Sequence, residues 1–187
     1  MRQTTAGEYA RPTSQESQES QASLAWVGLG SNLNEPSRML EGAREALSAL
    51  SSRPLLVSPL YLTPPWGVRE QPDFLNQVVA LSPLPHLTPE SLLEALLEIE
   101  RRFERTRELR WGPRTLDLDL LAWGQRERQS PSLCLPHPRI KERRFVLAPW
   151  CDLAPSLLLP QEGRPLSELL RCCPDHAEVT RLSEPSE

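Results

Sequence analysis

Two aspartates, Asp117 and Asp119, stand two residues apart inside an apolar run. Alternate side chains of an extended strand point to the same face, so both carboxylates would share one face and the intervening leucines the other. Adjacent carboxylates on a half-buried strand repel each other and require positive charge nearby. Hard oxygen ligands suit Mg²⁺, which keeps several waters and often also binds phosphates. The pair predicts a magnesium site, and a solvent-facing strand edge is the alternative.

An arginine-rich stretch leads into this strand, with Arg101, Arg102, Arg105, Arg107, Arg110 and Arg114. Guanidinium groups match phosphate oxygens in charge and geometry, so carboxylates beside arginines favour phosphoryl-transfer chemistry. Solvated surface charge is the alternative, but the sharp entry at Gly112-Pro113 and the apolar leucine face argue against it. Residues 104–113 carry too much charge to pack and are expected to form a mobile loop that closes over phosphates.

A second group of residues could bind a flat ring. The stretch 63–72 holds three prolines and a glycine, so it predicts a stiff loop. Trp66 in this loop would either fold back onto the core or offer an aromatic wall to a ligand. Asn76 shares a strand face with Phe74, and its amide would either cap backbone groups or pair with the edge of a heterocycle.

Two further polar side chains have open roles. Glu100 lies on a predicted helix and would either be solvated or lie near a nucleotide. His137 is held between two prolines, so its imidazole would either be structural or contact a phosphate or ribose.

The order of predicted elements gives the fold class. Apolar runs predict strands at 24–29, 55–62 and 73–81 and through the two aspartates. Helical periodicity follows Pro36, with Ser31 or Asn34 as the cap, and follows Thr88, which is the expected N-cap. The resulting strand-helix-strand-strand-helix-strand order predicts an α+β, ferredoxin-like βαββαβ sandwich. An additional C-terminal strand at 157–160 and a helix at 165–171 are expected.

Composition limits the other possibilities. A chain of 187 residues is expected to form one domain, here 23–173, between a disordered tail at 1–22 and a flexible tail at 174–187. The net charge of −4 argues against a non-specific nucleic-acid binder, and no apolar run is long enough for a membrane span. The four cysteines fit neither a zinc site nor a disulfide framework. We expect a cytoplasmic protein, monomeric, with small-molecule partners.

The run 111–121, W-G-P-R-T-L-D-L-D-L-L, resembles the signature of the 6-hydroxymethyl-7,8-dihydropterin pyrophosphokinases. G-x-G-S-N-L after the first strand, T-P-P-x-G, Q-P-x-[YF]-x-N, P-H-P and R-x-F also match, so the resemblance covers roughly residues 24–170. It implies an enzyme of folate biosynthesis that transfers pyrophosphate from ATP to 6-hydroxymethyl-7,8-dihydropterin and releases AMP. Another MgATP phosphotransferase and a non-catalytic pterin- or nucleotide-binding module are the alternatives.

The resemblance also implies a role for each matching residue. Two Mg²⁺ ions on Asp117 and Asp119 would bridge the ATP phosphates, with Arg105 and Arg114 as the other catalytic residues. The dihydropterin would contact Thr63, Pro64, Trp66, Phe74, Asn76, Trp111 and Phe145. The nucleotide would contact Glu100, Arg107, Arg110, Leu120, His137 and Arg143. Two departures from the family pattern are Glu104 and Arg144, each at a position where glycine is common.

Overall fold

The computed structural model describes residues 23–65, 70–103 and 112–183. The predicted roles of Trp66, Arg105, Arg107, Arg110 and Trp111, and the predicted tail at 1–22, lie outside these residues. No helix in the described ranges is both long and apolar enough to cross a membrane.

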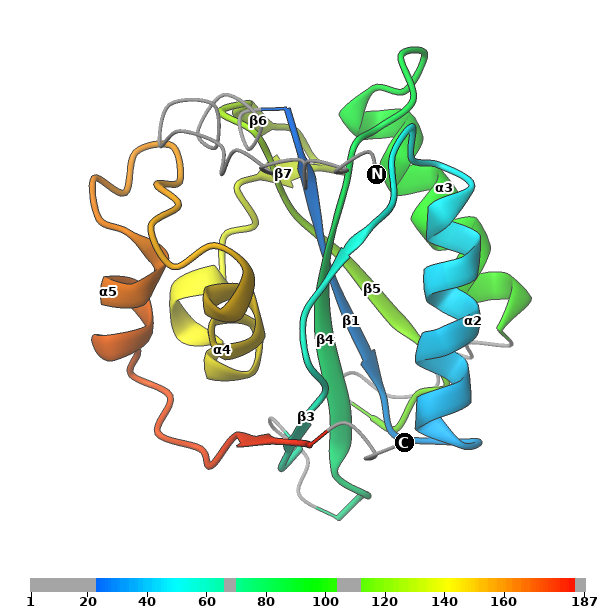
Figure 1. Cartoon of the computed structure of the whole chain (residues 1–187), viewed down its shortest axis with the longest axis vertical. Helices are drawn as coiled ribbons and strands as arrows, with labels where there is room; N and C mark the ends of the chain where they lie inside the picture. The colour runs from blue at the N-terminus through cyan, green and yellow to red at the C-terminus, as the bar shows by residue number, and fades with distance from the viewer. Residues whose placement is uncertain (1–22, 66–69, 104–111, 184–187) are drawn as a thin grey trace, which may run out of the picture.

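An antiparallel sheet forms the centre of the molecule (Figure 1). Its strands follow the order β5-β1-β4-β3-β8, and β2 also pairs with β4. The strands are β1 (Ala25–Ser31), β2 (Leu56–Val57), β3 (Tyr61–Thr63), β4 (Phe74–Leu81), β5 (Asp117–Trp123) and β8 (Thr180–Arg181). A separate pair joins β6 (Arg128–Gln129) to β7 (Cys134–Leu135).

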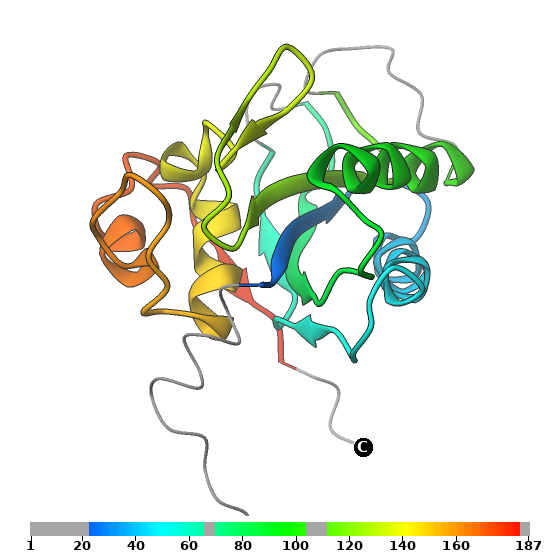
Figure 2. The same cartoon turned by 90° about the horizontal axis from the view of Figure 1, so that it is seen from above.

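Helices cover both faces of the sheet (Figures 1 and 2). On one face lie α2 (Pro36–Ser48) and α3 (Pro89–Arg102), and on the other lie α4 (Arg144–Leu153) and α5 (Leu166–Arg171), with the 3₁₀ turn η1 (Ile140–Glu142) before α4. The strand order and the crossover helices α2 and α3 confirm the predicted ferredoxin-like βαββαβ arrangement.

The N-cap predicted from the sequence is correct for α3 and wrong for α2. At α3, Thr88 and Ser91 form the expected reciprocal capping box, with Pro89 in the first turn. At α2 the expected cap by Ser31 or Asn34 is wrong, because the N-cap is Glu35 in a left-handed conformation without a side-chain cap bond. Ser31 instead donates its hydroxyl to the carbonyl oxygen of Thr115, 2.6 Å away.

Alternate side chains of β1 and β5 point to opposite faces of the sheet, so one set packs into a core and the other set includes the two aspartates. Val27 and Leu29 of β1 pack against α2 and α3 together with Leu118 and Leu120 of β5. Burial of each such side chain stabilises the fold by about 1.5–3 kcal/mol. The two aspartates of β5, which alternate with these leucines, are only partly buried and lie on the opposite face. The predicted division of β5 into a leucine face and an aspartate face is therefore confirmed.

Three predicted segments differ from the structure. The run 55–62 is not one strand, since β2 ends before Pro59 and β3 begins after it. The expected strand at 157–160 is absent: in this described segment Leu158 makes only an isolated bridge to Pro165.

The third difference is at the C-terminus, where the segment predicted as a flexible tail from residue 174 includes β8, paired with β3. Arg181 of β8 lies 3.7 Å from Asp152 of α4, and that carboxylate also accepts a hydrogen bond from the Tyr61 hydroxyl at 3.1 Å. Burial, with help from Asp152, raises the pKa of Tyr61 to about 12, so the phenol stays protonated as a donor. The C-terminal segment thus covers the edge of β3, the strand that ends in Thr63.

One close helix contact gives a stability prediction. A Cβ placed on Gly42 of α2 would lie 2.8 Å from Cζ of Phe103, at the end of α3. Gly42→Val is therefore expected to lower the free energy of unfolding by about 1–3 kcal/mol through overpacking, despite the better helix propensity of valine. Denaturant titration measures the change. Glu41→Val on the exposed side of α2 is the control, and equal stability of both variants would contradict the prediction.

Candidate functional site

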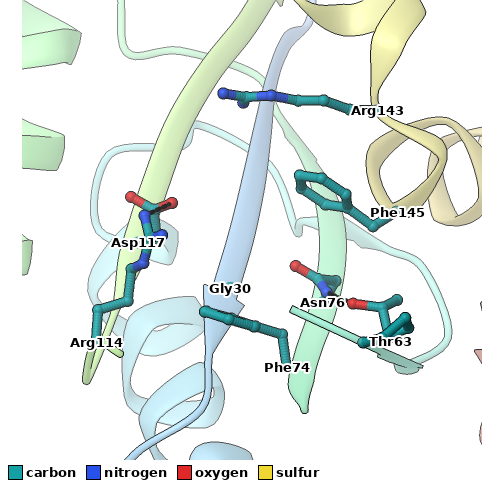
Figure 3. Close-up of a pocket in the computed structure, with 9 residues that line it drawn as sticks. Gly30, Thr63, Phe74, Asn76, Arg114, Asp117, Arg143 and Phe145 are labelled. Carbon is teal, nitrogen blue, oxygen red and sulfur yellow. Dashed lines mark hydrogen bonds and ion pairs between the residues drawn. The ribbon is translucent and has the colours of Figure 1, made fainter. Parts of the chain in front are cut away.

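A pocket opens on the aspartate face of the sheet, between the ends of β1, β4 and β5 and the start of α4 (Figure 3). Eight of its nine lining residues were predicted site residues, and the ninth is Gly30. The lining is Gly30, Thr63, Pro64, Phe74, Asn76, Arg114, Asp117, Arg143 and Phe145. Residues from five separate segments of the sequence thus converge on one cavity.

The Asn76 amide is fixed at the back of this pocket. It is 6% exposed, and its Nδ2 donates to the Thr63 hydroxyl oxygen at 2.7 Å. Its Oδ1 lies on the Gly30 side, where an added Cβ would approach it to 3.1 Å. The donor therefore binds a side chain and not the backbone, which disfavours the alternative of a backbone-capping asparagine. The fixed amide can present its oxygen to a ligand N–H.

Two aromatic rings flank the space in front of that amide. In Figure 3 Phe145 enters from the α4 side and Phe74 from the start of β4, with Asn76 between them. The Arg114 guanidinium carbon lies 5.4 Å from the Phe74 ring centre, and that of Arg143 lies 5.8 Å from the Phe145 ring centre. Apolar ring faces with one fixed polar edge suit a flat, polar-edged heterocycle.

Each aspartate of β5 is paired with an arginine. Arg114 Nη1 lies 2.9 Å from Asp117 Oδ2, and Arg143 Nη1 lies 2.6 Å from Asp119 Oδ2. Both arginine side chains are less than one-fifth exposed, and their buried Nε atoms have no hydrogen-bond acceptor within the part of the chain that the structure describes. The arginines offset the electrostatic repulsion between the two carboxylates. Each also keeps an N–H group that could donate a hydrogen bond to a ligand oxygen.

Glu100 supports the aspartate strand from behind. It is 3% exposed, and its Oε1 accepts the backbone N–H of Leu118 at 2.8 Å. Leu118 lies between the two aspartates, so this carboxylate fixes the strand at the point where they project. The alternative of a solvated helix residue is wrong, because α3 packs this side of its surface onto β5.

A second cleft of about 340 Å³ adjoins the first pocket and shares Asp117 with it. Glu100, Asp119, Leu120 and His137 all line it, so three of the predicted nucleotide contacts meet here. Arg143, the fourth predicted nucleotide contact in the described ranges, lines the first pocket instead. The remaining lining comes from three places: Leu93 and Leu97 of α3, Leu118 of β5, and the β6–β7 hairpin with the segment after it, at residues 130–134 and Pro138.

His137 is held as a neutral imidazole in this cleft. Burial lowers its pKa, against a smaller raising effect of Asp119. Its Nδ1 accepts the backbone N–H of Arg139 at 3.2 Å, which leaves the proton on Nε2. A neutral histidine with a fixed Nε2–H donor can bind a hydroxyl or phosphate oxygen.

Sequence reasoning missed several parts of the site. Gly30 appeared only as part of the G-x-G-S-N-L motif, although its place at the end of the first strand could have marked it as a lining residue. Leu93, Leu97 and the β6–β7 hairpin gave no signal, because their place depends on how α3 and the hairpin pack against β5. Asn32 was also missed; its Nδ2 donates to the Pro72 carbonyl oxygen at 2.9 Å and its Oδ1 accepts the Arg114 backbone N–H at 2.8 Å.

The small size of Gly30 gives a binding prediction. A methyl group there would press on Asn76 Oδ1 and lie 3.8 Å from the Asp117 Cβ. Gly30→Ala is expected to raise the Kd of a bound pterin by about tenfold, because the added methyl group displaces the Asn76 amide from the position that its hydrogen bond to Thr63 fixes. Calorimetric titration measures this. Gly28→Ala, whose added Cβ would have its nearest neighbours at ordinary van der Waals distance on Leu121, is the matched control, and equal affinities of the two variants would contradict the prediction.

The fold and the paired cavities define a class of protein, a phosphotransferase-type enzyme that presents carboxylates and arginines beside a pocket for a flat ring. The comparisons with known proteins narrow this class. Residues 26–155 match the family model described as 7,8-dihydro-6-hydroxymethylpterin-pyrophosphokinase (HPPK). The chain therefore belongs to the HPPK family, as the sequence resemblance predicted.

Curated relatives agree with the family match. A 2-amino-4-hydroxy-6-hydroxymethyldihydropteridine pyrophosphokinase of Pseudomonas aeruginosa is 49% identical over 150 residues, which cover 80% of this chain and 91% of the relative. A protein of the same name from Haemophilus influenzae is 39% identical over 156 residues, which cover 83% and 96% of the two chains.

Solved structures show the same fold at low sequence identity. The wild-type Plasmodium falciparum HPPK-DHPS with SDX-DHP has a TM-score of 0.58 at 13% identity, covering 79% of this chain and 43% of that one. An HPPK-DHPS in complex with substrates gives a TM-score of 0.59 at 12% identity, with the same two coverages. This chain thus spans less than half of those longer chains.

Proposed function

We propose that this chain transfers pyrophosphate from MgATP to 6-hydroxymethyl-7,8-dihydropterin, giving the dihydropterin diphosphate and AMP in folate biosynthesis. Membership of the family supports the reaction, and one structural observation supports where in the molecule the reaction takes place. Asp117 lines both cavities, so a group held at this carboxylate lies between a ring bound at Asn76 and a nucleotide bound near His137. The first pocket is assigned to the dihydropterin and the second cleft to ATP.

The donor set of the aspartate pair fits magnesium. Two carboxylates project from one face of β5, and within the described ranges no third histidine, cysteine or acidic side chain joins them as a metal cluster. Such a set leaves positions for water and phosphate oxygens, as Mg²⁺ prefers. When bound there, Mg²⁺ would neutralise triphosphate charge and favour attack by the substrate hydroxyl. Occupancy by two ions is part of the proposal.

The protein groups supply orientation and charge. Asn76 and the two phenylalanines would fix the pterin ring, so that its hydroxymethyl group points toward Asp117. Arg114 and Arg143 would leave their aspartates for phosphate oxygens, where their charge offsets that of the transferred and leaving groups. Arg105, Arg107, Arg110, Trp66 and Trp111, which lie outside the described residues, are proposed to complete the site.

We also propose the domain bounds, the cellular location, the oligomeric state and the partners that the sequence predicted. Residues 23–173 would be the pyrophosphokinase domain, and the protein would act as a cytoplasmic monomer on small molecules, without nucleic-acid or membrane partners. The net charge of −4 and the absence of a long apolar run in the sequence support this. Size-exclusion chromatography with light scattering tests the oligomeric state.

Nucleotide analysis after incubation with ATP, Mg²⁺ and the dihydropterin tests the reaction. AMP formed in equal amount to dihydropterin diphosphate is the expected result. ADP would indicate a different phosphotransferase, and calorimetric binding of both ligands without AMP would indicate a non-catalytic module. The control is the double variant Asp117→Asn/Asp119→Asn, which should release no AMP.

A further inference from the structure

Asp175 connects the C-terminal segment of the chain to the first turn of α4. It lies between α5 and β8 and is partly buried. Its Oδ2 accepts the backbone N–H of Arg144 at 3.3 Å, and its Oδ1 accepts the backbone N–H of Ala177 at 3.0 Å. The second bond closes a turn within the C-terminal segment, so the carboxylate is held in place where it faces α4.

The first turn of α4 has no cap of its own. Arg144 is the first residue of the helix, so its N–H is one of the four that have no acceptor inside the helix. The N-cap residue, Arg143, makes no side-chain cap bond, and the first turn holds no acidic residue. Asp175 therefore supplies, from outside the helix, both the acceptor and the negative charge that a helix N-terminus favours.

A second contact joins the same turn to the C-terminal part of the chain. Nη1 of Arg144 donates to the carbonyl oxygen of Leu170 in α5 at 3.5 Å. Arg144 stands where glycine is common in the family pattern, and a glycine could not make this contact. After Asp175 the chain continues to β8, which pairs with β3 (Figure 1). The segment is thus held by α5 before Asp175 and by β3 after it.

The first turn of α4 carries two side chains of the pocket assigned to the dihydropterin. Phe145 is the second residue of the helix and lines this pocket. Arg143, directly before the helix, also lines it and pairs with Asp119 at 2.6 Å. Figure 3 shows both side chains projecting from the α4 side. Asp175 lines neither cavity, so it acts on the pocket through the turn that it caps.

We propose that Asp175 is a positioning residue for the dihydropterin pocket: by capping α4 it keeps Phe145 and Arg143 in the positions that a bound ring requires. Without this cap the first turn of α4 frays in a fraction of the molecules, and the ring binds only to the ordered fraction. The apparent Kd rises in inverse proportion to that fraction. Asp175 lies beyond residues 26–155, which the family model matches. The inference rests on the proposed assignment of this pocket to the dihydropterin.

Removal of either of two helix caps in the same protein gives a matched test. Asp175→Ala removes the acceptor at α4, and Thr88→Ala removes the capping box of α3, whose first turn lines neither cavity. The Kd of 6-hydroxymethylpterin is measured by calorimetry with Mg²⁺ and saturating α,β-methylene ATP. We expect Asp175→Ala to raise this Kd by about five- to tenfold and Thr88→Ala to change it by less than about twofold. Hydrogen exchange in the first turn of α4 should be faster in Asp175→Ala alone.

Thermal melting verifies that each variant is folded. Both cap variants should melt below the unmodified protein, so a loss of stability by itself would not explain a difference in Kd between them. Asp175→Asn keeps one acceptor oxygen without the charge, so it should give an intermediate Kd, and it carries the test if Asp175→Ala does not fold. An unchanged Kd in the folded variant that carries the test, or an equal rise in Thr88→Ala, would overturn the inference alone. Failure of the unmodified protein to bind the pterin would overturn the proposed function as well.

Discussion

Replacing Asp119 with alanine is expected to lower kcat by about a thousandfold or more, equivalent to ~4 kcal/mol of transition-state stabilisation. The variant loses one of the two proposed metal ligands and leaves Arg143 without its 2.6 Å partner. The fold should persist, because β5 is held by Leu118 and Leu120 on its buried face and by the Glu100 bond to its backbone. Rapid-quench measurement of AMP formation at saturating ATP and dihydropterin gives kcat.

A matched control removes a carboxylate from an ion pair elsewhere. Glu162 is 18% exposed in its side chain and pairs with Lys141 at 2.8 Å, away from the lining of both cavities. Glu162→Ala should therefore keep kcat within about twofold, with a loss of stability of at most about 1 kcal/mol. If Asp119→Ala retained more than one-tenth of normal turnover while folded, the carboxylate pair could not be the principal site of charge stabilisation.

Short-range patterns predicted much of this molecule correctly. The two-residue alternation of aspartate and leucine gave the two faces of β5, since a strand of any register divides them in the same way. The Thr88 capping box depends only on residues within one turn, so it was also visible in the sequence. Family motifs then placed Thr63, Phe74, Asn76 and Phe145 together, although they come from three separate segments.

Features that depend on tertiary packing were not visible. Glu100 has the type and position of a solvated helix residue, and only the packing of α3 on β5 buries it against the Leu118 N–H. Asn32 reaches Pro72 across 40 residues and Arg114 across 82, separations at which sequence patterns carry no distance information. β8 is only two residues long and polar, so its pairing with β3 has no periodic signal.

Arg143→Gln is expected to change two measurable quantities in opposite directions. Without nucleotide, the guanidinium at 2.6 Å from Asp119 Oδ2 competes with any cation for that oxygen. Its removal should tighten Mn²⁺ binding, measured by electron paramagnetic resonance of the free ion, by about five- to tenfold. With ATP and dihydropterin, turnover should fall by about a hundredfold, because a buried phosphate partner is lost.

The physical reason for this opposition is that one charge serves two partners. In the free protein Arg143 stabilises the Asp119 carboxylate, and its side chain is only 14% exposed. Its buried Nε has no acceptor among the residues that the structure describes, so an N–H remains for an incoming phosphate oxygen. Exchange of the carboxylate for phosphate would release Asp119 to the metal at the same moment that the triphosphate arrives.

A control and a clear contradiction complete this test. Arg128→Gln removes an arginine whose side chain is 41% exposed and which pairs with Glu90 at 3.3 Å, and it should change neither quantity by more than about twofold. If Arg143→Gln weakened Mn²⁺ binding in the absence of nucleotide, the arginine would be assisting the metal site and not competing with it. The exchange of partners would then be wrong, even if turnover fell as expected.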